Sequence, residues 1–147
     1  LLAHHDSGNL YFKDDGDRSI SEDLQRHFAP GSIAVLAACN VVNEQANGDL
    51  LALLNEFGVD AIIGSPFAVD AEFGAEFATS FAAVLKENNQ NGNNPTIADL
   101  FEAAIRKMEE KYAAKGKGGR AQMAQELIMT GNDALRICPN ATNVEVQ

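Results

Sequence analysis

The sequence has few cysteines and few basic residues, and each shortage excludes a class of protein. Two cysteines, Cys39 and Cys138, can form at most one disulfide bridge, which is too few for a disulfide-stabilised scaffold. Eleven basic residues stand against twenty-one acidic ones, so the formal net charge is -10. A surface of that sign repels nucleic-acid phosphates and anionic membranes. We therefore expect neither a direct nucleic-acid partner nor a membrane partner.

Long hydrophobic runs are also missing. The longest apolar stretches, such as Ser32–Cys39, fall well short of the roughly 18–20 residues that a membrane-spanning helix needs. No basic segment precedes an apolar one near Leu1, so we expect no signal peptide. Together with the scarcity of cysteine, these features predict a cytoplasmic protein in a reducing compartment.

What is present is the composition of one ordinary globular domain. The chain has 147 residues, of which 46% are apolar and 22% are charged. This length can bury one sizeable core but is too short for two domains. We interpret residues 1–147 as a single domain.

The first half of the chain alternates short strands with helices. The expected elements are, in order, a strand end at Leu1–Ala3, a strand at Asn9–Phe12, a helix from Ser19 to Phe28, a strand at Ser32–Ala38, a helix from Leu50 to Phe57 closed by Gly58, and a strand at Val59–Gly64. The Ser32–Ala38 run is apolar on both faces and contains β-branched residues, which is typical of a buried parallel strand. Strand, helix and strand at this spacing predict a right-handed crossover.

The second half is dominated by helical patterns. The expected elements are a helix with apolar residues from Phe73 to Leu85 that ends in the Asn88–Asn94 tract, a helix capped by Thr96 and running to Tyr112, a loop at Lys115–Gly119, a helix over Arg120–Thr130 and a last strand at Ala134–Cys138. These elements predict an α/β fold with a mostly parallel sheet. Because only Leu1–Ala3 precedes His4, we expect the N-terminal strands of the sheet to be missing from this chain and supplied elsewhere.

Two chemically capable residues follow predicted strands. His4 comes after Leu1–Ala3, and Cys39 comes after Ser32–Ala38. Ligand sites of open α/β sheets lie at the carboxyl ends of the strands, so neighbouring strands would bring imidazole and thiol together. Such a pair is a nucleophile arrangement, in which the imidazole lowers the thiol pKa and later protonates the leaving group. Backbone N–H groups of His5 and Cys39 could stabilise the oxyanion.

The same residues also have non-catalytic interpretations. A cysteine at the end of an apolar strand is often only a small buried side chain. The pair His4-His5 is also typical of a purification tag, and Asn9–Phe12 resembles part of an engineered protease site. We interpret Cys138 as a core residue at a strand end and assign no function to His27.

Four blocks of the sequence nevertheless resemble one family. His4–Phe12 is similar to the caspase segment in which a strand ends in histidine before a short hairpin, and Leu36–Asn40 to the block in which a strand ends in Ala-Cys. Gly58–Asp70 and Thr130–Ile137 resemble two stretches of the CHAT domains, the caspase-like branch common in bacteria. The four blocks occur in the family's order and together span nearly the whole chain.

This resemblance implies a three-layer caspase-like fold, of which residues 1–147 would be the C-terminal part. It implies a cysteine endopeptidase with a dyad of His4 and Cys39, oxyanion-binding backbone at His5 and Cys39, and no cofactor or metal. His5 stands where the family usually has glycine, so His5 is the alternative catalytic imidazole. By the same resemblance the substrate is a protein or peptide, and a regulatory sensor domain or chain of a bacterial defence system triggers cleavage.

The resemblance also marks a substrate-binding loop. Ser65, Phe67 and Asp70 are its candidate residues, with Phe67 in a place where tryptophan is common. Asp70 would favour arginine or lysine before the scissile bond if it points inward. Equally, Asp70 and Glu72 can be the N-cap and a first-turn acid of the following helix.

Two other functions compete with the peptidase. The first is a catalytically inactive caspase-like domain that serves as an interaction scaffold, which the side chain of His5 favours. The second is a flavodoxin-type ligand-binding module, which we consider weaker because no glycine-rich phosphate loop follows any predicted strand.

Overall fold

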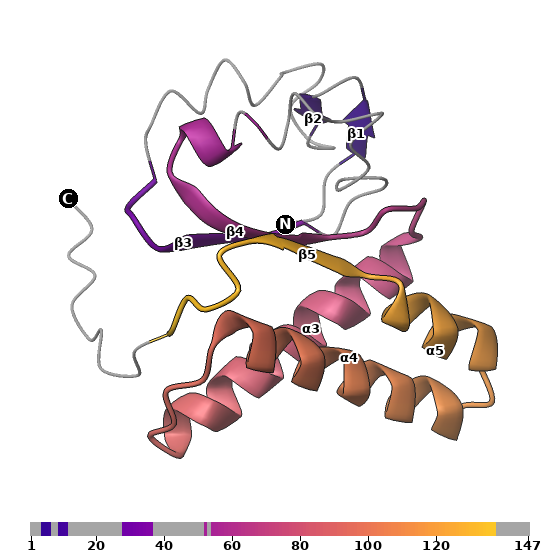
Figure 1. Ribbon diagram of the computed structural model, residues 1–147. Coiled ribbons are helices and arrows are strands. Elements are labelled where there is room, and N and C mark those ends of the chain that lie inside the picture. The colour runs from indigo at the N-terminus through magenta and orange to yellow at the C-terminus, as the bar shows by residue number, and fades with distance from the viewer. Residues whose placement is uncertain (1–3, 7–8, 12–27, 37–51, 53, 138–147) are drawn as a thin grey trace.

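The computed structural model describes residues 28–36, 52 and 54–137 in full, and the backbone alone of residues 4–6 and 9–11. Its elements are β1 His4–Asp6, β2 Asn9–Tyr11, β3 Ser32–Val35, β4 Val59–Gly64, α3 Ala71–Gln90, α4 Ile97–Ala114, α5 Gly118–Gln125 and β5 Ile128–Gly131. Helices α3, α4 and α5 lie on one side of a sheet formed by β3, β4 and β5, whereas the β1–β2 hairpin is drawn on the other side (Figure 1). The α/β class is therefore confirmed.

The three-stranded sheet has the order β3-β4-β5 and is mixed. β3 runs parallel to β4, while β5 pairs antiparallel with the other edge of β4. We predicted a mostly parallel sheet, and within the described residues only the β3–β4 pair is parallel. The chain reaches β5 from α5 in the direction opposite to β4, which makes the second pair antiparallel.

β3 and β4 pair in parallel, as the predicted crossover requires, and part of the helix expected between them is described. Ala52 and Leu54–Glu56 are helical, and the chain then enters β4 at the predicted residue, Val59. Gly58 closes the helical segment with a φ of 92°, and a Cβ on it would lie 2.9 Å from the Phe28 carbonyl oxygen. Only glycine satisfies both conditions, because a side chain there is strained and has no room.

The Asp60 residue at the start of β4 connects the ends of all three strands. Its Oδ2 accepts a hydrogen bond from the Gly31 N–H at 2.6 Å, and its backbone oxygen accepts one from the Asn132 N–H at 2.8 Å. Gly31 immediately precedes β3, and Asn132 immediately follows β5. One residue thus aligns the three strands at this end of the sheet.

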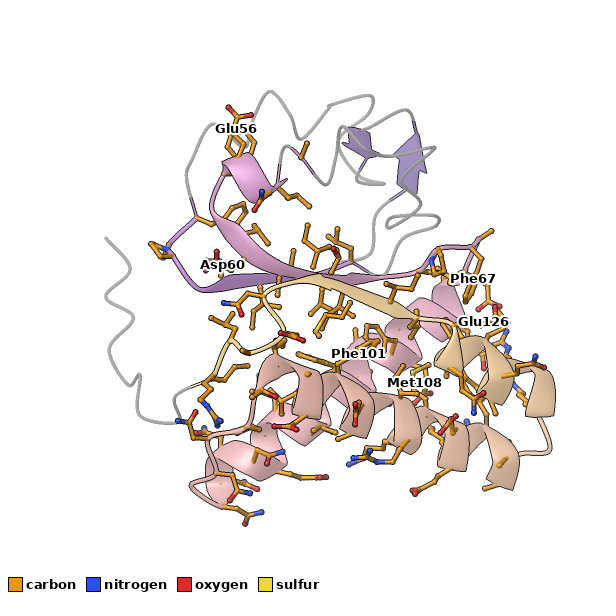
Figure 2. All side chains as sticks on the ribbon, in the orientation of Figure 1. Glu56, Asp60, Phe67, Phe101, Met108 and Glu126 are labelled. Carbon is orange, nitrogen blue, oxygen red and sulfur yellow. The ribbon has the colours of Figure 1, made fainter. Side chains whose placement is uncertain are left out.

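The main core lies between the sheet and the helices. The predicted apolar stripe of α4 is buried at Ile97, Leu100, Ala104, Met108 and Tyr112, and Met108 points into the protein in Figure 2. The opposing face of α3 contributes aromatic rings that pack against this stripe, namely Phe73, Phe77 and Phe81. Burial of a side chain of this size contributes about 1.5–3 kcal/mol, so this layer is a main source of stability.

The caps of both long helices were predicted and are confirmed. The Asp70 side chain accepts a hydrogen bond from the Phe73 N–H at 2.8 Å and caps α3. Thr96 and Asp99 form a reciprocal capping box at the start of α4, with the backbone N–H of each donating to the side chain of the other. The start of each helix is therefore fixed by its own local sequence.

The end of the described chain differs from the prediction. The helix expected over Arg120–Thr130 is the shorter α5, which starts within the expected Lys115–Gly119 loop, and Ile128–Gly131 is strand β5. The expected strand at Ala134–Cys138 is an irregular segment up to Ile137, with one bridge between Arg136 and Thr96. The free edge of β4 supplies hydrogen bonds to Ile128–Gly131, and this tertiary pairing overrides the helical propensity of Met129.

Several predicted features fall outside the described residues. They are the strand end at Leu1–Ala3, residues 19–27 of the helix expected from Ser19 to Phe28, and the end of the strand at Ala37–Ala38. None of the helices in the described part of the chain is long and apolar enough to span a lipid bilayer.

Candidate functional site

The structure places the backbone of the two candidate histidines in one short strand. His4 and His5 are the first two residues of β1, whose backbone pairs antiparallel with β2, with His4 opposite Tyr11. The strand predicted at Asn9–Phe12 is present as β2, Asn9–Tyr11. We expected His4 to follow the end of a strand beside β3, but His4 is instead the first residue of β1, and among the described residues β1 and β2 form a two-stranded sheet separate from β3-β4-β5. Cys39 lies outside the described residues, as does the Leu1–Ala3 strand that we expected beside β3. The proposed dyad therefore stays a prediction.

The loop that follows β4 is described in full and contains the predicted substrate-binding residues. Ser65 is 2% exposed, and its hydroxyl donates to the Phe67 carbonyl oxygen at 2.8 Å and accepts from the Phe67 N–H at 3.1 Å. The hydroxyl therefore closes a tight turn directly after the strand. The buried Ser65 side chain thus stabilises the conformation of the loop through hydrogen bonds to its backbone.

Phe67 lies at the end of the sheet where α3 begins (Figure 2). Its half-buried ring packs edge-on against Phe73, with the ring centroids 6.3 Å apart. Phe73 in turn stacks on Tyr112 of α4 at 6.1 Å. This row of aromatic rings joins the loop to both long helices, so its position is fixed by the core.

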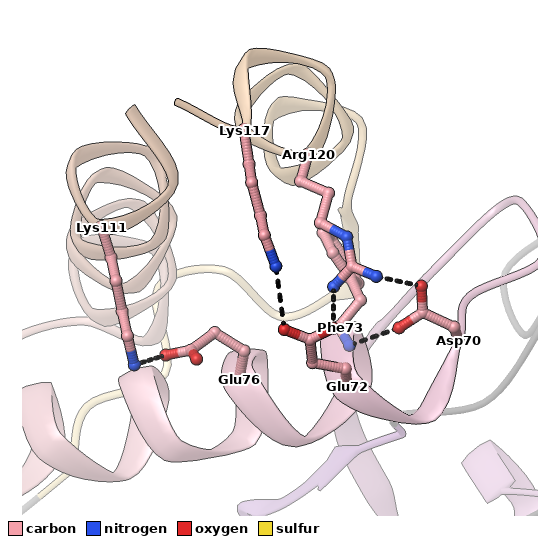
Figure 3. Close-up of polar contacts among 7 residues, drawn as sticks. All are labelled: Asp70, Glu72, Phe73, Glu76, Lys111, Lys117 and Arg120. Carbon is pink, nitrogen blue, oxygen red and sulfur yellow. Dashed lines mark hydrogen bonds and ion pairs between the residues drawn. The ribbon is translucent and has the colours of Figure 1, made fainter. Parts of the chain in front are cut away.

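Asp70 has two partners inside the protein. Its Oδ1 accepts the capping hydrogen bond from the Phe73 N–H. Its Oδ2 accepts a hydrogen bond from Nη2 of Arg120 at 2.6 Å. Both partners lie within reach of one carboxylate because α5 crosses the N-terminus of α3 (Figure 3). The N-cap interpretation of Asp70 is confirmed, and its carboxylate forms an ion pair with Arg120 of the same chain.

Arg120 is the centre of a larger charged cluster. Its Nη1 forms an ion pair with Oε2 of Glu72 at 3.0 Å. The other oxygen of Glu72, Oε1, forms an ion pair with Nζ of Lys117 at 3.2 Å. Farther along α3, Glu76 forms an ion pair with Lys111 of α4 (Figure 3). The acids come from the first turns of α3 and the bases from α4, α5 and the turn between them. Acidic side chains near a helix N-terminus also interact favourably with its dipole.

The basic half of this cluster was missed by sequence analysis. The Lys115–Arg120 segment is a concentration of positive charge in a chain with a large acidic excess. The available signal was its charge complementarity with Asp70 and Glu72, but no local pattern gives the fold that brings residues fifty positions apart into contact.

The cluster changes the acidity of Glu72. The hydrogen bond from Lys117, together with the charge of Arg120, holds the pKa of Glu72 below its ordinary value of 4.5. Because the pKa is lowered in the folded state, the stabilisation is present above the ordinary value and is lost as pH falls through the lowered one. We expect an NMR titration of Lys117→Gln to show a higher Glu72 pKa than in the wild type.

The matched control for that titration is Lys115→Gln. It removes the same charge from the same turn, but Lys115 is not a partner of Glu72 in the cluster. The Glu72 pKa should then stay close to its wild-type value. Equal shifts in both variants would show that overall charge, and not the contact with Lys117, controls Glu72.

A cavity lies at the opposite end of β4 from the loop that follows this strand. This cavity of about 290 Å³ is lined by Ala52, Asn55, Val59, Asp60, Ile62, Thr130 and Gly131. Figure 2 places Asp60 and Phe67 at opposite ends of the sheet. None of the predicted site residues lines this cavity. The carboxylate that lines it belongs to Asp60, whose Oδ2 accepts a hydrogen bond from the Gly31 N–H.

In the part of the chain that the structure describes, no three histidine, cysteine, aspartate or glutamate side chains gather as a metal site would require. No family model, curated protein or solved structure matches this chain. Its function is therefore inferred from its own motifs and geometry.

Proposed function

We propose that this chain is the C-terminal part of a caspase-like cysteine endopeptidase domain of the CHAT type, with Cys39 as nucleophile and His4 as general acid and base. The substrate is a protein or peptide. A regulatory sensor domain or partner chain activates the enzyme as part of a bacterial defence system.

The observation that supports this proposal best is the common end of β3 and β4. Leu36 follows β3, is 6% exposed and donates its N–H to the Ile63 carbonyl oxygen at 2.8 Å. The parallel pairing therefore continues past β3, and Cys39 comes three residues later. β4 ends at Gly64, so the Ser65–Asp70 loop starts at the same edge of the sheet. Carboxyl ends of parallel strands are where α/β folds bind their ligands.

The proposed chemistry requires only a thiol and an imidazole. The Cys39 thiolate attacks the scissile carbonyl carbon, and backbone N–H groups of His5 and Cys39 stabilise the oxyanion. The C–N bond breaks as the His4 imidazolium gives its proton to the leaving amine, which leaves a thioester. His4 then removes a proton from water, whose oxygen attacks the thioester and releases the acid and the thiol.

The second candidate is a domain of the same fold without catalysis. His5 replaces the glycine that the family usually has, and a side chain raises the cost of a positive φ at that place. The Ser65 hydroxyl and the Asp70 carboxylate both have partners within the chain. In this alternative the loop and its charged neighbours serve to bind another protein.

Labelling with an electrophilic chloroacetamide separates the two candidates. In the activated full-length protein we expect Cys39 to react at least about tenfold faster than Cys138, because an imidazole lowers the thiol pKa. His4→Ala should abolish this preference, while His5→Ala should keep it. Equal labelling of both cysteines would favour the non-catalytic scaffold domain. If only His5→Ala abolishes the faster labelling of Cys39, His5 and not His4 is the catalytic imidazole.

A further inference from the structure

One side-chain amide in the polar turn that joins α3 to α4 differs from its neighbours. Asn91 is the C-cap of α3, is exposed, and is followed directly by Gly92. In the part of the chain that the structure describes, Asn91 makes hydrogen bonds with its backbone N–H and none with its side chain. Figure 1 shows this turn at the end of the helical layer opposite α5. The side-chain amide of Asn91 is therefore accessible to attack.

Three other asparagines of the same tract are held or blocked. Nδ2 of Asn88 donates to the Val84 carbonyl oxygen at 3.0 Å, and Oδ1 of Asn88 accepts from Nδ2 of Asn93 at 3.2 Å. Asn94 precedes Pro95, whose backbone nitrogen carries no hydrogen. Asn91 is thus distinguished by its side chain and by the residue that follows it.

An asparagine side chain can be attacked by the backbone nitrogen of the next residue. This nitrogen bonds to Cγ, the Cγ–Nδ2 bond breaks, and ammonia leaves with the backbone N–H proton, so that a succinimide ring remains. Water then adds to one of the ring carbonyl carbons, and the ring opens to aspartate or isoaspartate. A following glycine favours the attack because it has no Cβ. At Gly92 no atom lies within 4 Å of the Cβ position, so the surroundings leave this nitrogen open as well.

Ring closure requires a rotation that this turn permits. Asn91 has a ψ of 0°, which keeps the Gly92 nitrogen away from the Asn91 Cγ. Rotation about the Cα–C bond of Asn91 breaks the hydrogen bond from the Gly92 N–H to the Asn89 carbonyl oxygen, at 3.2 Å. The bond from the Asn93 N–H to the Asn88 carbonyl oxygen opens with it. Both bonds lie at the end of a helix, where local opening costs little free energy.

We propose that Asn91 is a site of intramolecular deamidation, in which the Gly92 nitrogen displaces the side-chain amide and water opens the ring to aspartate or isoaspartate. The reaction requires none of the proposed catalytic residues. Its product places a carboxylate at the C-terminus of α3, whose last turn contains no basic residue. Negative charge at this end opposes the helix dipole. Isoaspartate also adds a methylene group to the main chain of the turn, so both products weaken the connection between α3 and α4.

Peptide mapping of the folded chain tests this site. The protein is kept in mildly alkaline heavy-oxygen water, which labels the new carboxylate, and is then digested with trypsin. Cleavage after Lys86 and Arg106 separates the Asn91 peptide from the other Asn-Gly pair, Asn47-Gly48. We expect Asn91 to convert at least about tenfold faster than Asn89, which is exposed in the same peptide but precedes glutamine. Conversion of Asn91 no faster than that of Asn89 would overturn the proposal.

Two glycine variants test the attacking atom. Gly92→Ala should slow the conversion of Asn91 by at least about tenfold, because the added methyl group hinders the nitrogen. Gly116→Ala is the matched control and should leave the rate unchanged. Gly116 has a φ of 67° against 66° for Gly92, and it also has no atom within 4 Å of its Cβ position. Equal rates in Gly92→Ala and the wild type would reject attack by the Gly92 nitrogen. The comparison with Asn89 decides the matter if Gly92→Ala does not fold.

Urea unfolding measures the structural consequence. Asn91→Asp reproduces one product, and we expect a lower unfolding midpoint than for Asn91→Gln, which keeps an uncharged amide at this position. High salt should reduce the difference, because it screens the interaction with the helix dipole. Equal midpoints at low salt would show that the modification does not destabilise this end of α3.

Discussion

A Cys39→Ala variant of the activated full-length protein is expected to lose peptide cleavage by at least about a thousandfold. Under the proposed mechanism this change removes the nucleophile and with it covalent catalysis, so that the proposed oxyanion donors and substrate binding alone would leave only a small residual rate. The loss should appear in kcat and in kcat/KM together, because alanine at position 39 removes an interaction made in the transition state. Single-turnover cleavage of a fluorogenic peptide library, followed by mass spectrometry, measures it.

Cys138→Ala is the matched control for this prediction. It makes the same chemical change at the other cysteine of the chain, which we interpret as a structural residue. Its activity should stay within a few-fold of the wild type. Cleavage that survives in Cys39→Ala but disappears in Cys138→Ala would reject the proposed nucleophile.

The second large effect is structural. Gly131→Ala is expected to destabilise the protein by about 3 kcal/mol or more, because backbone strain and overpacking add at this residue. Gly131 has a φ of 99°, and a Cβ there would lie 2.3 Å from the Asp60 carbonyl oxygen and 3.1 Å from the Ala61 Cα. These atoms belong to the backbone of β4, so relief requires separating β5 from its neighbour. Urea unfolding followed by circular dichroism measures the difference.

Gly92→Ala provides the comparison that isolates the steric contribution. Gly92 also has a positive φ, of 66°, but no atom lies within 4 Å of the position of its Cβ. It should therefore cost only about 1 kcal/mol, the usual penalty for a left-handed alanine. If Gly131→Ala is no worse than Gly92→Ala, the close approach between β4 and β5 is incorrect.

Local sequence patterns predicted the helical half of the fold well. The apolar spacing from Phe73 to Leu85 and the Thr96 cap predicted α3 and α4, because each pattern is contained within one helix. The apolar run at Val59–Gly64 predicted β4 with its observed bounds. These features depend on periodicity and caps, which act over a few residues.

The sequence predicted less well wherever distant segments decide the structure. Ile128–Gly131 is a strand because β4 has a free edge, and nothing within those four residues shows this. In the same way, Asp70 was identified as both a cap and a substrate-binding candidate, but Arg120 was not identified as its partner. The pair depends on how α5 crosses α3, which is a property of the tertiary fold.

The connection of β4 to both of its neighbours has a consequence for the order of folding. α3 and α4 are joined by a short link and pack on each other, so they can associate while the rest of the chain is unformed. β5 can pair with β4 only after α3, α4 and α5 have been synthesised, since these helices lie between the two strands in the sequence. Contacts that close long loops form slowly. During synthesis β4 therefore leaves the ribosome long before β5, and one edge of this apolar strand stays exposed to aggregation until β5 pairs with it.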